Sequence, residues 1–331
     1  MTSGPRPSED ELIARYFAPI SGEGAFALRD DAALLRVSEG RDLVLTLDTI
    51  VAGVHFFPDD PPSAIGRKAL GVNMSDLAAK GATPAGFLLS LSLPDDWSAD
   101  WMRDFADGLR EAALAFRSPL LGGDTVRAKG PLSLSVTAVG EVPRGRMVHR
   151  FTGQAGDRIC VTGTIGDAAL GLMLRLSPGA DWTAGLSIDK RVYLTDRYLH
   201  PRPRLAAAEA VREHARAAMD ISDGLAGDLA KMARSSGLSA EVDVSLLPLS
   251  PAARAALAGD PRLIDRILTG GDDYELLCAV PEDHVPAFLD ACMRAGVPAA
   301  AIGSLVEGAD VPLFRDGAFE RRYAKGSYSH F

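Results

Sequence analysis

The chain has 331 residues, of which 47% are hydrophobic and 24% charged, and its formal net charge is −9. This length allows two domains, each with a substantial buried core, and the composition is that of a folded globular protein. The acidic balance argues against a nucleic-acid partner, because a polyanion would be repelled at long range.

The cysteines and the apolar stretches indicate the compartment. Cys160, Cys278 and Cys292 are widely separated and form no C-x-x-C pair, so we expect buried, reduced and unreactive thiols. Residues 1–11 lack the apolar core of a signal peptide. The longest apolar stretch, 87–93, is far shorter than the about 20 residues of a membrane-spanning helix. We expect a cytoplasmic protein with no membrane contact.

The first half of the chain alternates helical and strand patterns. Ser8 and Glu11 form a capping box that predicts a first helix. On a later helix, Asp76 shares one face with Ile65 and Val72, which puts a carboxylate on an apolar stripe. In chain order we expect a helix at 8–17, strands at 31–37 and 43–47, a helix at 63–80, a strand at 87–93, a helix at 98–116 and a strand at 132–142.

A composition break at residues 143–145 predicts a domain boundary near residue 150, which gives domains 1–150 and 151–331. Pro203 stands at a plausible first helical position. In the second half we expect helices at 167–176, 203–213 and 224–234, and strands at 217–220, 240–244 and 274–280.

Six aspartates in five short segments, with Asp220 and Asp223 in the same one, are the strongest chemical signal. They lie at strand ends, in glycine-rich turns or on an apolar helical stripe, where a carboxylate must be paired or must meet a cation. Hard oxygen ligands in this number suit Mg²⁺, which is commonly shared with substrate phosphates. The set comprises Asp31, Asp48, Asp76, Asp124, Asp220 and Asp223. The pattern indicates an enzyme that uses several metal ions to act on phosphates.

Each local signal also has a simpler interpretation. The sequence Gly122-Gly123-Asp124 would let backbone N–H groups approach a phosphate, but it also makes an ordinary turn. Ser222 or Asp223 could simply cap the helix that follows, although a cap does not explain Asp220.

Three further segments leave alternatives open. Residues 270–276 form either a charged hairpin or a polar clamp on a substrate, and His55 is either a surface loop residue or part of a site. The aromatic tail, 325–331, would dock on the body or stack on a ring.

Several common signatures are absent from the sequence. It has no P-loop, no protein-kinase catalytic loop and no histidine pair with zinc-hydrolase spacing. Gly22, Gly24 and Ala27 fit a dinucleotide fingerprint only superficially, since no clear strand precedes them.

Taken together and in this order, seven segments resemble the thiamine-monophosphate kinase family: 12–17, 30–35, 48–56, 72–79, 122–125, 220–225 and 270–276. The resemblance implies an α/β (α+β) protein with the two-domain fold of aminoimidazole ribonucleotide synthetase. In that fold, a mixed-sheet N-terminal domain dimerises and an α/β C-terminal domain completes the active site. It also implies a cytoplasmic homodimer that uses ATP and several Mg²⁺ ions to convert thiamine monophosphate to thiamine diphosphate.

The resemblance also assigns residues, with no covalent nucleophile and no general base among them. The implied metal ligands are Asp31, Thr46, Leu47, Asp48, Asp76, Asp124, Asp220 and Asp223. The implied ATP contacts are Gly123, Asp124, Arg150 and Ser222, and the implied substrate contacts are His55, Asp272 and Tyr328. Two positions depart from the family pattern: Asp272 stands where glutamate is usual, and Leu47 where a hydroxyl residue is usual.

The expected chemistry is direct phosphoryl transfer between two anions. Unit charges about 4 Å apart repel by about 4 kcal/mol at an effective dielectric near 20, and bridging Mg²⁺ would offset this repulsion. One alternative is another ATP-dependent synthetase of the superfamily, which would need a nucleophile-handling cysteine or lysine, and residues 1–25 show none. The other is a non-catalytic nucleotide-binding relative, which would be expected to lack some of the six aspartates.

Overall fold

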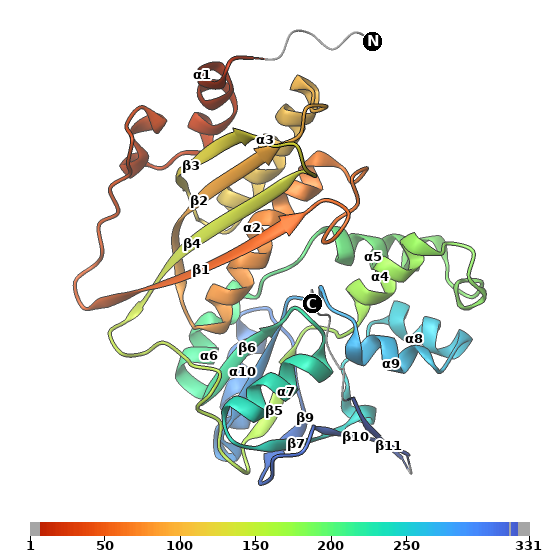
Figure 1. The fold of residues 1–331 in the computed structure, drawn as a ribbon. Coiled ribbons are helices and arrows are strands. Elements are labelled where there is room, and N and C mark those ends of the chain that lie inside the picture. Colours follow the sequence, from red (N-terminus) through yellow and green to blue (C-terminus); the bar gives the residue numbers. More distant parts are fainter. Residues whose placement is uncertain (1–6, 318, 324–331) are drawn as a thin grey trace. The chain divides into compact units, whose positions relative to one another are not determined.

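The computed structural model describes residues 7–317 and 319–323 (Figure 1). The chain forms two compact units, one from Met1–Leu77 and Ala82–Gly145 and the other from Ala78–Gly81 and Arg146–Phe331. In the described part of the chain, no helix combines the length and the apolar character that a membrane crossing requires.

The first unit is built on a four-stranded mixed sheet. Its strands are β1 (Arg41–Val51), β2 (Thr83–Leu93), β3 (Leu120–Arg127) and β4 (Ser133–Pro143), in the order β1-β4-β2-β3. Strand β4 pairs antiparallel with β1 and β2, whereas β2 and β3 are parallel. The helices α2 (Pro62–Ala79) and α3 (Ala99–Ala115) cover one face of this sheet (Figure 1).

The opposite face of this sheet remains apolar and exposed. Along β1, Val44 and Ile50 point to the helices and are buried, while Leu45 and Leu47 point away and are 64% and 58% exposed. This is the two-residue alternation of a strand with one covered face. Leu88 of β2 is also exposed. We call this surface the outer face.

The N-terminal segment starts as predicted and then departs from the prediction. The capping box of Ser8 and Glu11 is present, but α1 spans only Glu9–Leu12 and continues as a π-helical turn, Ile13–Phe17. The strand predicted at 31–37 is wrong, because these residues pair with no strand in the described structure, and Leu34 and Val37 are exposed. An apolar run without a neighbouring strand cannot complete its backbone hydrogen bonds as a sheet.

The second unit contains a seven-stranded sheet in the order β11-β10-β7-β9-β5-β8-β6. Its strands are β5 (Arg158–Thr162), β6 (Ala217–Ile221), β7 (Ser239–Asp243), β8 (Glu275–Val280), β9 (Ala299–Val306), β10 (Leu313–Asp316) and β11 (Phe319–Arg322). The helices are α4 (Asp167–Leu176), α5 (Ile188–Leu199), α6 (Ala208–His214), α7 (Leu225–Ser235), α8 (Pro251–Gly259), α9 (Leu263–Thr269) and α10 (Val285–Arg294). Pro203 lies ahead of α6 rather than at its first position, so that prediction is wrong.

The sheet of the second unit has a buried core on each face. Ile159 and Val161 of β5 belong to one core, and Cys160 between them belongs to the other. All three cysteines are buried and free, as predicted. Burial raises the pKa of Cys160 to about 12 and that of Cys292 to about 11, so the reactive thiolate is disfavoured.

Candidate active site

The junction of β1 and α2 carries the first group of predicted site residues. The sequence placed Asp48 at a strand end, but β1 continues to Val51, so Thr46 and Asp48 both point toward α2 from within the strand. Thr46 Oγ1 donates to Asp76 Oδ2 at 2.5 Å. The backbone N–H of Asp48 donates to Oδ1 of Asn73 at 3.0 Å. These side chains present only hard oxygen donors, which fit Mg²⁺.

Leu47 can contribute a ligand only through its backbone, because its side chain lies on the outer face. Backbone hydrogen bonds Arg144 N to Gly40 O and Ala52 N to Leu132 O, both 2.9 Å, extend the β1–β4 ladder at even-numbered positions of β1. Because an antiparallel ladder alternates, the carbonyl of an odd position points away from the partner strand. The Leu47 carbonyl therefore points away from β4, and also away from Asn73, because it belongs to the same peptide group as the Asp48 N–H.

A cavity of about 710 Å³ in the first unit brings Asp31 together with the segment Gly122, Gly123 and Asp124. This segment is not a turn, as one sequence interpretation had it, but part of β3. The sequence pattern did not predict this strand, because the two glycines have low strand propensity. A Cβ at Gly123 would lie 1.9 Å from the carbonyl oxygen of Leu89, so only glycine allows this pairing.

The aspartates of the first unit form separate groups. Asp124 pairs in register with Ser90, and both are exposed on the outer face, opposite to the face that carries Thr46 and Asp48. Within residues 7–317 and 319–323, no group of three or more His, Cys, Asp or Glu side chains is arranged to hold a metal ion. A single copy of the first unit does not bring the four predicted site aspartates, Asp31, Asp48, Asp76 and Asp124, together.

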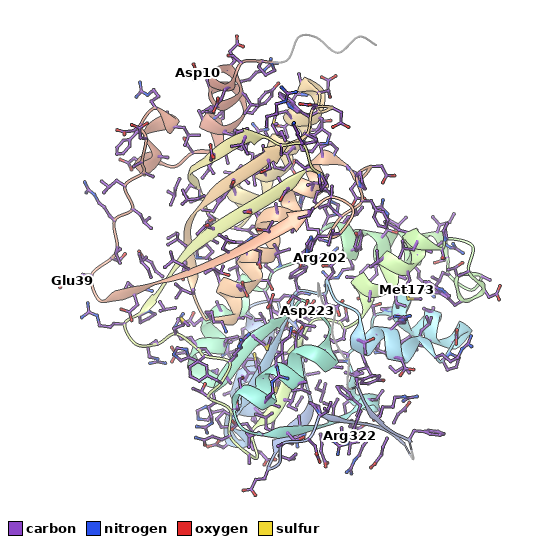
Figure 2. The ribbon with its side chains drawn as sticks, in the orientation of Figure 1. Asp10, Glu39, Met173, Arg202, Asp223 and Arg322 are labelled. Atoms are coloured by element: carbon purple, nitrogen blue, oxygen red, sulfur yellow. The ribbon has the colours of Figure 1, made fainter. Side chains whose placement is uncertain are left out.

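In the second unit, Asp220 is the second-last residue of the buried strand β6 and is itself buried. Asp223, labelled in Figure 2, lies in the loop before α7. The predicted cap by Ser222 or Asp223 is wrong, because the N-cap of α7 is Gly224. Instead the carboxylate of Asp228 accepts from the backbone N–H groups of Ser222 at 3.0 Å and Asp223 at 2.9 Å.

Lys231 completes this arrangement one turn further along α7. Its ammonium group contacts the carboxylate of Asp223 and donates to Oδ1 of Asp228 at 2.9 Å. Burial raises the pKa of Asp228 despite the nearby Lys231 charge. Burial lowers the pKa of Lys231, but its bonds to the two carboxylates outweigh this effect and raise it overall. The ammonium group therefore stays charged beside Asp223.

The segment 270–274 is not a free hairpin but packs against the loop that carries Ser222. The backbone N–H of Asp272 donates to Ser222 O at 2.9 Å, and that of Tyr274 donates to Ile221 O at 2.8 Å. A Cβ at Gly271 would lie 2.2 Å from Ser222 O, so this close approach requires glycine. Asp272 is thereby held next to Ser222.

The remaining predicted residues lie on other segments of the chain. His55 lies in the turn after β1, where its Nδ1 accepts from the backbone N–H of Val51 at 3.0 Å. Arg150 is exposed, and its carbonyl accepts from Ser235 Oγ at 3.4 Å. Tyr328 and the rest of the predicted aromatic tail lie outside the described residues.

Three polar residues of these groups were not predicted as site residues from the sequence: Asn73, Asp228 and Lys231. A signal was present for two of them. Asn73 lies on the same helix as Asp76, and Asp228 falls on the apolar stripe of α7 between Leu225 and Leu229, where an aspartate needs a partner.

Comparisons with known proteins agree with this architecture. Residues 29–142 match the family model "AIR synthase related protein, N-terminal domain", and residues 154–315 match "AIR synthase related protein, C-terminal domain". Hydrogenase maturation protein HypE in complex with ATP shares the fold at a TM-score of 0.78 and 19% identity, over 97% of this chain and 95% of that one. The fold and the site elements thus define a two-domain AIR synthase-related protein.

Closer relatives specify the family. Thiamine-monophosphate kinase of Caulobacter vibrioides is 42% identical over 94% of this chain and 88% of its own length, and that of Escherichia coli K12 is 40% identical over 98% of both. The crystal structure of thiamine-monophosphate kinase from Stenotrophomonas maltophilia K279a has a TM-score of 0.80 at 41% identity, over 88% of this chain and 91% of that one. A complex of AaThiL with AMPPCP and TMP has a TM-score of 0.77 at 30% identity, over 98% and 94%. The chain belongs to the thiamine-monophosphate kinase family of enzymes.

Proposed function

We propose that this chain transfers the terminal phosphoryl group of ATP to thiamine monophosphate, giving thiamine diphosphate and ADP. The observation that carries the proposal is the hydrogen bond of 2.9 Å between Asp272 N and Ser222 O. It joins an expected acceptor contact to an expected ATP contact, and direct transfer requires the two substrates to lie side by side. The relatives named as thiamine-monophosphate kinases match nearly the whole chain, which supports this choice of acceptor.

Transfer would be direct and in line, with a phosphate oxygen of the acceptor as nucleophile. That phosphate is largely ionised at neutral pH, since its second pKa is near 6, so no protein base is needed. Mg²⁺ ions, when bound, would neutralise the repulsion between the two anions and align them. The residues proposed to hold them are Asp31, Thr46, Asp48, Asp76, Asp124, Asp220 and Asp223, together with the Leu47 carbonyl.

Hydrogen-bond donors that are already bonded within the protein are not available to ATP, and this limits which groups can contact it. The backbone N–H groups of Ser222 and Asp223 are bonded to Asp228, so the Ser222 contact would come from its hydroxyl. Gly123 lacks a side chain, which would let a phosphate approach its backbone. Arg150 is exposed and would pair with ATP phosphates.

Acceptor recognition would use His55, Asp272 and Tyr328. Asp272 is one methylene shorter than the glutamate usual in the family, so its loop must bring the carboxylate closer to the acceptor. The short backbone bonds of this loop to Ile221 and Ser222 support such a placement.

We further propose that two copies pair through the outer face of the first unit. Leu45, Leu47 and Leu88 are exposed on one sheet face, and burying them is favourable at about 25 cal/mol per Å². Asp124 shares this face, so pairing would enclose it and would let the second copy complete a metal site that one copy does not assemble. The N-terminal domain, to about residue 150, would thus bind ATP and Mg²⁺ and dimerise, while the C-terminal domain completes the active site of a cytoplasmic enzyme.

A coupled ADP-release assay over a panel of phosphorylated acceptors tests the assignment. We expect strong preference for thiamine monophosphate, and loss of about 10²-fold or more of kcat in Asp124→Asn and Asp220→Asn. Asp290→Asn on the exposed face of α10 is the matched control and should behave as wild type. Inactivity toward thiamine monophosphate would reject the assignment and favour another synthetase or a nucleotide-binding relative. Full activity of both site variants would reject the metal roles, and a trapped phosphoenzyme would reject direct transfer.

A further inference from the structure

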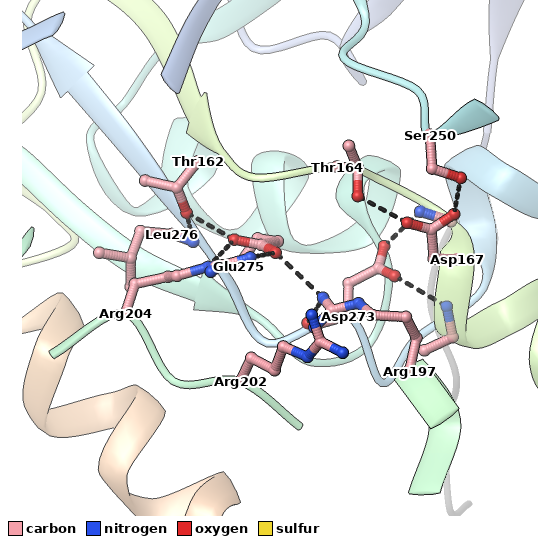
Figure 3. A network of polar contacts seen from close by, with 12 residues as sticks. Thr162, Thr164, Asp167, Arg197, Arg202, Arg204, Ser250, Asp273, Glu275 and Leu276 are labelled. Atoms are coloured by element: carbon pink, nitrogen blue, oxygen red, sulfur yellow. Dashed lines mark hydrogen bonds and ion pairs between the residues drawn. The ribbon is translucent and has the colours of Figure 1, made fainter. Parts of the chain in front are cut away.

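A buried ionic network involves Asp273 and Glu275, which follow Asp272 closely in the chain. Glu275, the first residue of β8, is fully buried and accepts from Arg204 Nε at 2.6 Å and from Thr162 Oγ1 at 2.8 Å. Arg197 of α5 reaches the same carboxylate, with Nη2 to Oε1 at 3.0 Å. Figure 3 shows the Arg197 guanidinium between Glu275 and Asp273, with Arg204 on the other side of Glu275.

The ion pair with Glu275 alone does not account for the burial of Arg197. Its side chain is 2% exposed, and its Nε and Nη1 have no hydrogen-bond partner among the residues that the structure describes. A buried guanidinium with unmet donors is costly, and Arg204 already supplies Glu275 with a bidentate partner. The distinctive contact of Arg197 is a second bond from Nη2, to the backbone carbonyl of Asp273 at 3.2 Å.

That carbonyl sits inside a strained segment. Asp272 and Tyr274 have φ of 72° and 51°, a left-handed conformation that side chains other than glycine rarely adopt. Asp273 between them is held from two directions. Its carboxyl group accepts from the backbone N–H of Gly166 at 2.6 Å, and its carbonyl accepts from Arg197.

The two anchors have different effects on the segment. The carboxyl group of Asp273 ties it to the start of α4, while Arg197 on α5 fixes the orientation of the peptide that follows Asp273. A rotation of this peptide would change ψ of Asp273 and φ of Tyr274 and would disturb the bond from Tyr274 N to Ile221 O, so it would shift the segment that carries the Asp272 carboxylate.

We propose that Arg197 is a positioning residue for acceptor recognition, which fixes the peptide between Asp273 and Tyr274 through the Asp273 carbonyl and so holds the segment that presents Asp272. The inference rests on the proposed function, in which Asp272 contacts thiamine monophosphate. Arg197 itself does not touch the substrates. Its loss affects acceptor binding more than ATP binding, because Asp228 still holds the backbone N–H of Ser222 when the Asp272 segment shifts.

Steady-state kinetics of Arg197→Gln and Arg197→Lys test this role. We expect the KM for thiamine monophosphate to rise about tenfold or more in Arg197→Gln, with the KM for ATP changed by less than about threefold. Arg197→Lys keeps a charge toward Glu275, but its side chain is shorter and reaches the Asp273 carbonyl less well, so we expect an intermediate rise. If Arg197→Gln does not fold, Arg197→Lys provides the decisive measurement. The melting temperature of each variant is measured in parallel.

Arg191→Gln is the matched control from the same helix. Arg191 donates to the carbonyls of Leu186 at 3.3 Å and Pro178 at 3.1 Å, so it stabilises the fold without contact to the Asp272 segment. We expect it to lower the melting temperature with both KM values unchanged. An Arg197→Lys variant with an unchanged KM for thiamine monophosphate, or with an equal rise in both KM values, would overturn the inference alone. A wild-type protein that does not turn over thiamine monophosphate would overturn the proposed function as well.

Discussion

Substituting Gly271 by alanine should separate the two loops that carry Ser222 and Asp272. The new Cβ would lie 2.2 Å from Ser222 O and 3.2 Å from Asp223 Cα. An ordinary carbon–oxygen contact is roughly 1 Å longer than the first of these distances, so the backbones must move apart. This movement breaks or weakens the bonds from Asp272 N and Tyr274 N, which are 2.9 and 2.8 Å long.

The expected cost follows from these terms. Two weakened hydrogen bonds contribute about 0.5–1.5 kcal/mol each, and overpacking adds about 1–3 kcal/mol. The free energy of unfolding should therefore fall by about 2–6 kcal/mol. For a unit of this size, each kcal/mol lowers the melting temperature by about 2–4 °C, so a decrease of about 4–24 °C is expected.

Thermal unfolding followed by circular dichroism, together with the KM for thiamine monophosphate, would check this prediction. Gly179→Ala is the matched control, because nothing lies within 4 Å of its added Cβ. It should leave stability unchanged or raise it slightly through the unfolded state. If Gly271→Ala unfolded at the same temperature as Gly179→Ala, the described contact between the loops would be wrong.

Three further predictions follow from burial and exposure. Burial raises the pKa of Asp273 from 3.8 to about 8, so folding favours its protonated form, and the stability it contributes is complete below pH 4 and is lost as the pH rises toward 8. Asp273→Asn should flatten this decline, seen as the slope of melting temperature against pH; an unchanged slope would contradict the shift. Cys160, Cys278 and Cys292 should resist a thiol reagent in the native protein and all react after denaturation, and rapid native labelling would refute their burial. Leu45→Glu should shift the molecular mass in light scattering from dimer to monomer, whereas an unaltered mass would exclude the outer face as the interface.

The sequence predicted the elements whose signal is local. The helices expected at 63–80, 98–116 and 167–176 correspond to α2, α3 and α4, and the strand expected at 132–142 corresponds to β4. Their apolar residues repeat with the period of the element, because one face of each is buried. The wide spacing of the cysteines, without a C-x-x-C pair, predicted that they are buried and free.

Local sequence patterns gave wrong predictions where the pairing of strands decides the structure. The run at 31–37 resembles a strand but has no strand beside it in the described structure, whereas residues 120–127 form β3 despite two glycines because β2 pairs with them. A strand depends on its neighbour for its hydrogen bonds, and the sequence of one segment does not contain that neighbour.

For the candidate site too, one part could be predicted from the sequence and another part could not. The order of its short acidic and glycine-rich segments was enough, from the sequence alone, to identify the family, because several such segments in one fixed order are specific even though each alone is not. Only the tertiary structure decided which of them meet. It placed Asp124 and Asp48 on opposite faces of one sheet, gave Ser222 and Asp223 their anchor in Asp228, and put Arg197 behind the Asp272 segment. These contacts join residues far apart in the chain or on separate elements, so no periodicity within one segment can encode them.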